Sequence, residues 1–377
     1  MICNQNVWKR KSICGWKAFH KYLLLVPMLL VSVSICTTAQ AQNAQNGYVQ
    51  KKLVSDMSGV AHTTDRNLVN SWGIARNPTG PWWVNDNGTG VSTLYNGNGD
   101  PFPLTAPLVV TIPPPEGGTG TATPTGIVFN GTKDFEVATN KPARFIFVTE
   151  DGTISGWNPD VNQTNAVLKA DNSKSGAVYK GAALALANGV PYLYAANFHN
   201  GTVDVFDTDF KKVTLPNGAF TNPSIQAGFA PFNVVNVDGR IFVTYAKQGA
   251  NKHDDVAGAG NGFVDIFTPD GTLLMSLKHG PWLNSPWGAV LAPANFGKLS
   301  NMILIGNFGS GEIAAYDLNG NFQGLMKGTD GKSITIDGLW GLGFGNGQTA
   351  GPATTLFFAA GPNGEKNGLF GTLTPGQ

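Results

Sequence analysis

Residues 196–207 read ANFHNGTVDVFD, and residues 306–317 read GNFGSGEIAAYD. Both stretches begin with a small residue, Asn and Phe, continue through a glycine turn into an apolar run, and end with Asp. A phrase that one chain contains twice indicates a repeated structural unit, and internal repeats are the first feature to test in a chain of 377 residues.

A shorter, glycine-centred motif precedes each unit and sets the period of the repeat. It reads NSWGIA, TPTGIVF, YKGAALA, APFNVV, SPWGAV and GLWGLGF, and its central residues are Gly73, Gly126, Gly181, Asn233, Gly288 and Gly341. The successive spacings are 53, 55, 52, 55 and 53 residues. So even a spacing predicts six copies of one supersecondary unit.

Each unit contains signals for several β-strands. A short apolar run follows each glycine-centred strand and is typical of a strand buried on both faces. These runs are residues 81–84, 144–148, 191–196, 240–245, 301–306 and 355–360. An alternating strand such as GTVDVFD comes next, and then an outer strand such as residues 272–279 or 321–328. We therefore predict an all-β fold, a six-bladed β-propeller of four-stranded blades.

The two ends of the chain indicate how the ring closes. The last unit contains only three strand signals, whereas residues 47–56, GYVQKKLVSD, form a surplus strand before the first glycine-centred motif. A propeller protects its sheet edges by forming a closed circle. We expect the N-terminal strand to complete the sixth blade.

The N-terminus has the pattern of a secretory signal peptide. Five basic residues are followed by the apolar run YLLLVPMLLVSVSI and by small residues at Ala39 and Ala41. The run is shorter than the roughly 20 apolar residues of a membrane span. We predict cleavage after Ala41, with residues 1–41 as signal peptide and residues 42–377 as the propeller of a secreted, extracellular or periplasmic protein.

Removal of the leader changes the charge and the thiol content. Five of the 25 Lys+Arg and none of the 24 Asp+Glu precede residue 42, so the remaining charge is 20 minus 24, or −4. A weakly acidic chain argues against nucleic acid and anionic membranes as partners. All three cysteines also lie in the leader, which leaves no disulfide. A lipoprotein anchored at Cys36 is the less favoured alternative, because bulky Ile35 precedes that cysteine. We expect a monomer without a membrane span.

These motifs resemble a known group of proteins. The GIA, VTED and GTVDVFD segments are similar to NHL-type six-bladed propellers. The segments NLVNSWGIA, WWVNDNGTGVSTLY, YAANFHNGTVDVFD, NSPWGAV and IDGLWGLGFGNG resemble a family of secreted bacterial propellers, some of which end in a PEP-CTERM sorting tail. The resemblance covers about residues 53–374 and implies a fold and a compartment, but no activity. Because this sequence lacks the Pro-Glu-Pro tail, we expect free secretion.

The residues that close the buried strands form a first candidate site. They are Asp86, Glu150, Asn197, Tyr245, Asn307 and Gly361. Equivalent positions point toward one end of a propeller, so Asp86, Glu150, Asn197 and Asn307 are candidate metal ligands. Their oxygens suit Ca²⁺, which takes roughly six to eight such ligands. Six-bladed, calcium-dependent lactonases of the gluconolactonase type use a similar set. The alternative, which we favour, is that these side chains cap the turns that follow.

The residues before the central glycines form a second candidate site. A ring of Trp72, Lys180, Phe232, Trp287 and Trp340 around the channel, with Thr125 at the sixth position, would offer aromatic faces to a sugar or another flat ligand. The alternative, again favoured, is that these rings pack between the blades.

A glycine-rich insertion in the fourth unit is a third candidate feature. Residues 246–262 read AKQGANKHDDVAGAGNG, and Lys252, His253, Asp254 and Asp255 could cover one face or bind a cation. A long polar loop is also often mobile.

The sequence thus favours an extracellular module that binds a carbohydrate or protein. A calcium-dependent lactonase or lyase-like hydrolase is the alternative, and a structural matrix protein is a third possibility.

Overall fold

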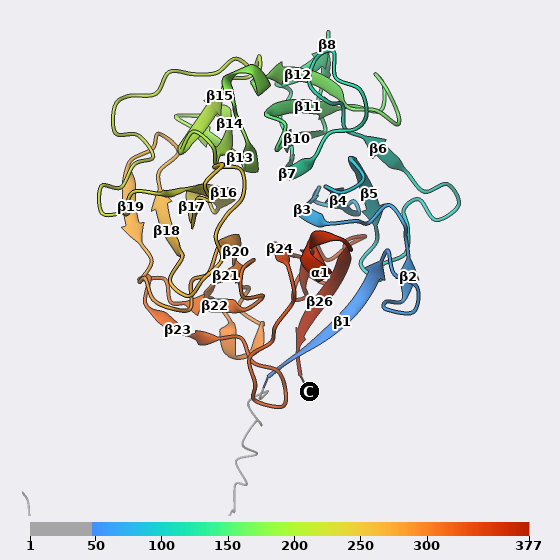
Figure 1. The fold of residues 1–377 in the computed structure, drawn as a ribbon. Helices are drawn as coiled ribbons and strands as arrows, with labels where there is room; N and C mark the ends of the chain where they lie inside the picture. The colour runs from blue at the N-terminus through green and yellow to red at the C-terminus, as the bar shows by residue number, and fades with distance from the viewer. Residues whose placement is uncertain (1–46, 377) are drawn as a thin grey trace, which may run out of the picture. The chain divides into compact units, whose positions relative to one another are not determined.

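The computed structural model describes residues 47–376. The predicted signal peptide and the three cysteines lie outside the described residues. Six small β-sheets follow one another in chain order around a ring (Figure 1). The predicted all-β, six-bladed propeller is therefore confirmed. Within residues 47–376, no helix has the length and apolar character needed to cross a membrane.

The first three blades are numbered from the innermost strand outward. They are β3 (Ser71–Arg76), β4 (Trp82–Asp86), β5 (Val91–Tyr95) and β6 (Val109–Thr111); β7 (Pro124–Phe129), β10 (Phe145–Thr149), β11 (Thr153–Trp157) and β12 (Val167–Asp171); and β13 (Tyr179–Ala187), β14 (Val190–Asn197) and β15 (Thr202–Phe206). The hairpin of β8 (Glu136–Ala138) and β9 (Lys141–Pro142) connects β7 to β10, and η1 (Ser173–Ser175) follows β12.

The last three blades have the same order of strands. They are β16 (Phe229–Val237), β17 (Arg240–Lys247), β18 (Gly262–Phe267) and β19 (Leu273–Ser276); β20 (Pro286–Leu291), β21 (Ile303–Asn307), β22 (Ile313–Tyr316) and β23 (Phe322–Leu325); and β24 (Leu339–Phe344), β25 (Leu356–Ala360) and β26 (Leu369–Pro375) with β1 (Tyr48–Ser55). The short β2 (Thr63–Thr64) pairs with β1, and η2 (Gly297–Leu299) and the four-residue α1 (Pro362–Glu365) lie in loops.

Blade three departs from the prediction, because it has three strands instead of four. After β15 the chain forms one isolated bridge, Phe206 to Lys212, and then leaves the sheet. The segment that follows contains Pro216 and Pro223. Proline has no N–H to donate, so a strand in this segment could pair with β15 only where these two residues face away from it.

The N-terminal strand closes the ring as predicted. β1 pairs with β26 in antiparallel register from Tyr48 opposite Pro375 to Ser55 opposite Leu369. In Figure 1 the blue strand lies beside the red one. The Tyr48 hydroxyl donates to the Phe296 carbonyl at 2.6 Å. β1 thereby links blade six to the loop of blade five.

Glycine recurs in the innermost strands because neighbouring blades approach each other closely there. A Cβ atom on Gly341 would lie 2.6 Å from the Trp72 carbonyl oxygen, and one on Gly288 would lie 2.7 Å from that of Trp340. Asn233 takes this position in blade four, and its amide donates to the Trp287 carbonyl at 2.9 Å. The repeated glycine therefore lets six strands surround a narrow channel.

The hydrophobic core is divided between the blades. One buried cluster lies at each of the six junctions between adjacent blades, and a seventh lies on the channel axis. At the closing junction, Leu53 and Val54 of β1 pack in one cluster with Trp82 and Tyr95 of blade one. Burial of this apolar surface makes the stability of the ring depend on β1.

We predict that deletion of residues 47–55 destabilises the entire ring, because it removes the β1–β26 ladder and uncovers the cluster around Trp82. The unfolding temperature measured by calorimetry should fall by well over ten degrees, or the cooperative transition should be lost. Val49→Ala is the control, since this β1 side chain is 47% exposed. A deletion variant that unfolds at the temperature of the intact protein would contradict this role of β1.

Candidate functional site

Four aromatic members of the predicted ring converge and fill the channel. Trp72 and Trp340 stack with ring centroids 3.6 Å apart, and Trp287 meets both rings edge-on. Phe232 contacts Trp340, and each of the four side chains is at most 5% exposed. We call Trp72, Phe232, Trp287 and Trp340 the aromatic plug. Its geometry is that of core packing.

Lys180, the charged member of the ring, lies on the aromatic plug. Its side chain is 3% exposed, and Nζ is 5.1 Å from the centroid of the Trp72 ring. Nζ also donates a short hydrogen bond to Oε1 of Glu150, the residue that follows β10. A buried charge is costly unless it is paired. Lys180 and Glu150 form this pair, and the Trp72 face adds a cation–π contact.

A chain of polar side chains continues from the ion pair across this end of the channel. Asn87 donates to Glu150 Oε2 at 2.7 Å, and Asn70 donates to Asn87 Oδ1 at 3.2 Å. The same Asn70 amide donates to Glu365 Oε2 at 3.1 Å. Blades one, two, three and six thus contribute to one hydrogen-bonded network.

Glu365 reaches this network from an unusual turn. Asn363, Gly364 and Glu365 in α1 all have positive φ, at 60°, 62° and 64°. Non-glycine residues rarely adopt this left-handed conformation, and such strain is concentrated at functional positions. Burial and, to a lesser extent, the charge of Glu150 raise the pKa of Glu365 to about 7, although the charge of Lys180 acts to lower it.

The insertion between β17 and β18 adds further titratable groups. His253 Nδ1 lies 2.8 Å from Asp254 Oδ1 and 4.0 Å from Glu150 Oε1. Partial burial acts to raise the pKa of Asp254, but the hydrogen bond with His253 and the charge of Lys180 outweigh it, so that this pKa is lowered. Burial raises the pKa of Asp255, although a hydrogen bond from Ser285 acts against it.

Three of the predicted metal ligands are hydrogen-bonded to turns and strands near them. Asp86, Asn197 and Asn307 are fully buried. Asn307 accepts from the Asn284 N–H at 2.9 Å and donates to the Glu312 carbonyl at 3.0 Å. Asn197 donates to Asp204, and Asp86 accepts from Thr93. Burial raises the pKa of Asp86 well above its usual range. Glu150 is the member of the predicted set that joins the network at the channel.

A pocket of ≈ 280 Å³ lies beside Glu365. Phe308 lines it and stacks on Trp340 of the plug, with centroids 3.9 Å apart and an interplanar angle of 16°. Asp337 and Glu365 add two carboxyl groups. We call this the mouth pocket; its lining is Ala257, Phe308, Gly309, Asp337, Gly338, Gly361, Gly364 and Glu365.

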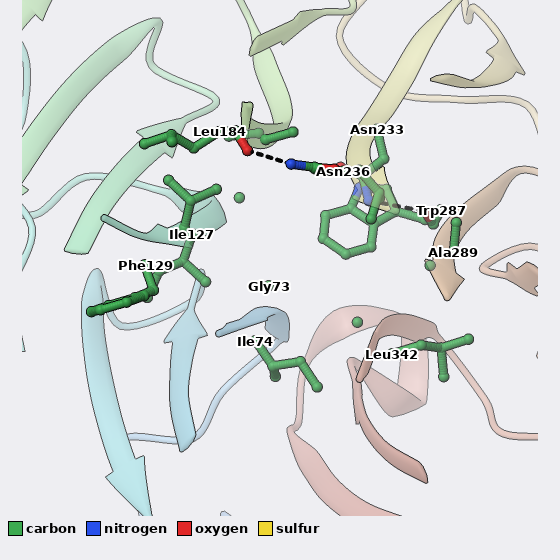
Figure 2. A pocket seen from close by; sticks show the side chains of 17 residues that line it. Gly73, Ile74, Ile127, Phe129, Leu184, Asn233, Asn236, Trp287, Ala289 and Leu342 are labelled. Carbon is green, nitrogen blue, oxygen red and sulfur yellow. Dashed lines mark hydrogen bonds between the residues drawn. The ribbon is translucent and has the colours of Figure 1, made fainter. Parts of the chain in front are cut away.

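A second cavity of ≈ 220 Å³ is lined by the innermost strands (Figure 2). Its lining includes Ile74, Leu184 and Leu342 together with Trp287 of the plug. The amide of Asn236 donates to the Leu184 carbonyl, and that of Asn233 to the Trp287 carbonyl (Figure 2). No residue of this lining is ionisable. Of these two cavities, the mouth pocket is the one with ionisable side chains in its lining.

Sequence reasoning missed several residues of the site. Phe198 and Phe308 are the phenylalanines of the repeated phrase that ends in Asp207 and Asp317, so the repeat itself contained a signal for them. Both belong to the cluster of the aromatic plug or pack against it. Asn70 and Glu365 occupy loops where no repeated motif indicated their role. Asn87 stands at the repeat position of these two phenylalanines but differs from them in residue type.

Comparison with known proteins gives a family but no activity. No family model matches the chain. It is 30% identical over 336 residues to the uncharacterised protein R648 of Acanthamoeba polyphaga mimivirus, a match that covers 86% of this chain and 80% of R648. The chain belongs to the R648 family. A further mimivirus protein, L690, is 29% identical over 338 residues and matches 85% of its own length.

Solved structures similar to this R648-family chain share its fold. A streptogramin B lyase has a TM-score of 0.51 and 11% identity, with 88% of this chain and 99% of that chain covered. A Bacteroides thetaiotaomicron protein of unknown function has a TM-score of 0.52 and 11% identity, with coverage of 86% and 76%. Such low identity shows the fold alone. Because the sequence relatives are viral, the resemblance to secreted bacterial propellers is supported for the six-bladed fold, but not for a bacterial family or a sorting tail.

We predict that the protein loses stability as the pH rises from about 4.5 to 7. The folded protein holds the Glu365 proton more tightly than the unfolded chain, whose glutamate has an ordinary pKa. The contribution of protonated Glu365 to the stability of the fold is therefore complete below the pKa of the unfolded chain. It is lost as the pH rises through the pKa of Glu365 in the folded protein. The increase in the pKa of Glu365 corresponds to about 3 kcal/mol in the free energy of unfolding. Glu365→Gln, which retains an acceptor for Asn70, should flatten this dependence in thermal unfolding from pH 4.5 to 8.

Glu116→Gln is the matched control, because Glu116 is an exposed glutamate remote in sequence from the network. An unchanged pH profile in Glu365→Gln would contradict the assignment of the pH dependence to Glu365.

Proposed function

We propose that the protein is a ligand-binding module and that its ligand is a carbohydrate held in the mouth pocket. The observation that carries the proposal is the presence of the Phe308 ring and the carboxyl groups of Asp337 and Glu365 in one pocket. An aromatic ring packs against the C–H face of a sugar, while carboxylates accept hydrogen bonds from its hydroxyls. A few polar groups in a partly apolar pocket are the usual composition of a small-molecule site.

The pocket residues are held in place by the structure around them. Phe308 rests on Trp340 of the plug, and the Asn363 N–H donates to Asp337 Oδ2 at 2.8 Å. Glu365 is fixed by Asn70. Preorganised groups lose little conformational entropy when a ligand binds. The contacts that hold Phe308, Asp337 and Glu365 in place therefore favour the binding of a ligand in the mouth pocket.

The location of this binding is part of the proposal. The signal sequence predicted over residues 1–41 supports an extracellular or periplasmic site of action, where carbohydrates are available. The calculated charge of −4 without the leader suits an uncharged glycan better than an acidic one.

A glycan array with residues 42–377, followed by calorimetry on the best-bound glycan, tests this function. We predict that Phe308→Ala weakens binding by about tenfold or more, because stacking on an aromatic ring contributes roughly 1 kcal/mol beyond buried area. Phe322→Ala is the control, since Phe322 stacks on Trp282 outside the mouth pocket. Retention of full affinity by Phe308→Ala, or the absence of any bound glycan, would reject the carbohydrate proposal.

A divalent-cation-dependent hydrolase, the second candidate, is favoured by one observation. One ligand atom from each of Glu150, His253 and Asp254 lies within 4.8 Å of the others. The set fits Ca²⁺ poorly, because it offers few oxygens and Lys180 already binds Glu150. A cation could bind there only if Lys180 moved away.

Thermal unfolding after EDTA treatment, with and without millimolar Ca²⁺, Mg²⁺ or Mn²⁺, tests this candidate. An ion at about 100 times its Kd would stabilise the fold by ~2.7 kcal/mol, which is visible as a shift of several degrees. The hydrolase candidate predicts such a shift and its loss in Glu150→Gln, whereas Glu116→Gln should keep it. If no ion shifts the transition, the metal-dependent activity is excluded at this site.

A further inference from the structure

The outer edge of blade three lacks the strand that every other blade has. The third strands β5, β11, β18 and β22 each pair with an outer strand of this chain, and β26 pairs with β1. β15 is the last strand of its sheet. Apart from the bridge of Phe206 to Lys212, the position of a fourth strand is therefore vacant in one of the six blades.

Part of the backbone of β15 has no partner at this edge. The Val205 carbonyl accepts from the Val213 N–H at 2.7 Å, which shows that Val205 turns its backbone groups outward. Successive residues of a strand alternate between the two edges, so Val203 also faces outward. Among residues 47–376, no hydrogen bond to the Val203 N–H and C=O or to the Val205 N–H is formed at this edge. Unpaired strand groups are a template for another strand.

A groove of ≈ 510 Å³ lies along this edge, larger than the mouth pocket. Residues 201–205, 212–215 and 219–221 line it. Val203, Val205, Leu215 and Phe220 give it an apolar lining. Two charged residues of the lining, Lys212 and the buried Asp204, form an ion pair at 2.8 Å. The groove thus combines apolar side chains with free backbone donors and acceptors.

We propose that this groove binds an extended peptide segment of a partner protein, which adds to β15 as the fourth strand of blade three. The other blades show the occupant that this position accepts, namely a short extended strand. Both ends of the described chain are already used in blade six. Within residues 47–376 no further strand is left over at this edge, so we assign the added strand to another polypeptide. The recognition mode is β-strand addition, with backbone hydrogen bonds for affinity and an apolar, β-branched residue over Val203 and Val205 for specificity.

A synthetic peptide that copies the outer strand of blade two is a suitable probe. Residues 165–172, NAVLKADN, contain β12, which occupies the equivalent position against β11. Hydrogen exchange monitored by NMR reports on the amides concerned. We expect the Val203 and Val205 amides to exchange quickly in the free protein and at least tenfold more slowly with saturating peptide. A peptide with proline in place of Leu168 should give no protection.

Two variants of the protein test the groove independently. Val203→Pro removes one free N–H. Thr214→Trp fills the groove with a large side chain, because Thr214 is an exposed residue of its lining. Each should weaken peptide binding at least tenfold in fluorescence titration. Asn217→Trp is the matched control, because Asn217 is an exposed residue of the same loop that does not line the groove. Thr214→Trp keeps the test valid if Val203→Pro fails to fold.

Three outcomes would overturn the proposal. The first is that no peptide binding is detected. The second is that binding occurs without protection of Val203 and Val205, or persists in Thr214→Trp. The third is that the protein alone forms dimers, detected by sedimentation, that Thr214→Trp dissociates, which would assign the edge to a second copy of this chain.

Discussion

The antiparallel ladder between β1 and β26 is the constraint on which the other features of the structure depend. It joins the two ends of the described chain in one sheet and completes the circle of blades. Six of the buried clusters each lie between two blades, so an open ring would expose the cluster at the break. Closure also determines the diameter of the channel and brings the innermost strands close enough for their side chains to meet on the axis.

The aromatic plug is the first consequence of this closure, and the charge arrangement above it is the second. Trp72, Trp287 and Trp340 come from blades one, five and six and contact one another only in the closed ring. Lys180 occupies the same repeat position as these tryptophans, so its charge is carried into a buried environment. Pairing with Glu150 compensates for the loss of hydration. Asn87 and Asn70 then link this pair to Glu365, whose burial makes its protonation sensitive to pH near neutrality.

Three blades depart from the regular repeat. Blade four carries the insertion with His253 and Asp254 instead of a tight turn, and blade six carries the left-handed turn that presents Glu365. Blade three omits its outer strand and leaves a groove. Most repeated positions serve packing. Glu365 and the groove of blade three lie where the repeat is broken, whereas Phe308 of the mouth pocket is a residue of the repeated phrase.

The sequence by itself determined the six-bladed fold, the positions of the buried strands and the closure of the ring by residues 47–56. These features follow from local periodicity and from the spacing of glycines, both of which are readable along one chain. Tertiary structure alone decided that the tryptophans fill the channel, that Glu150 pairs with Lys180 and that Glu365 is buried beside them. Such contacts join residues from different blades, and their distances depend on the radius of the closed ring. Tertiary structure also decided that blade three lacks an outer strand. The prolines after β15 do not by themselves exclude an edge strand, so the sequence did not predict this absence.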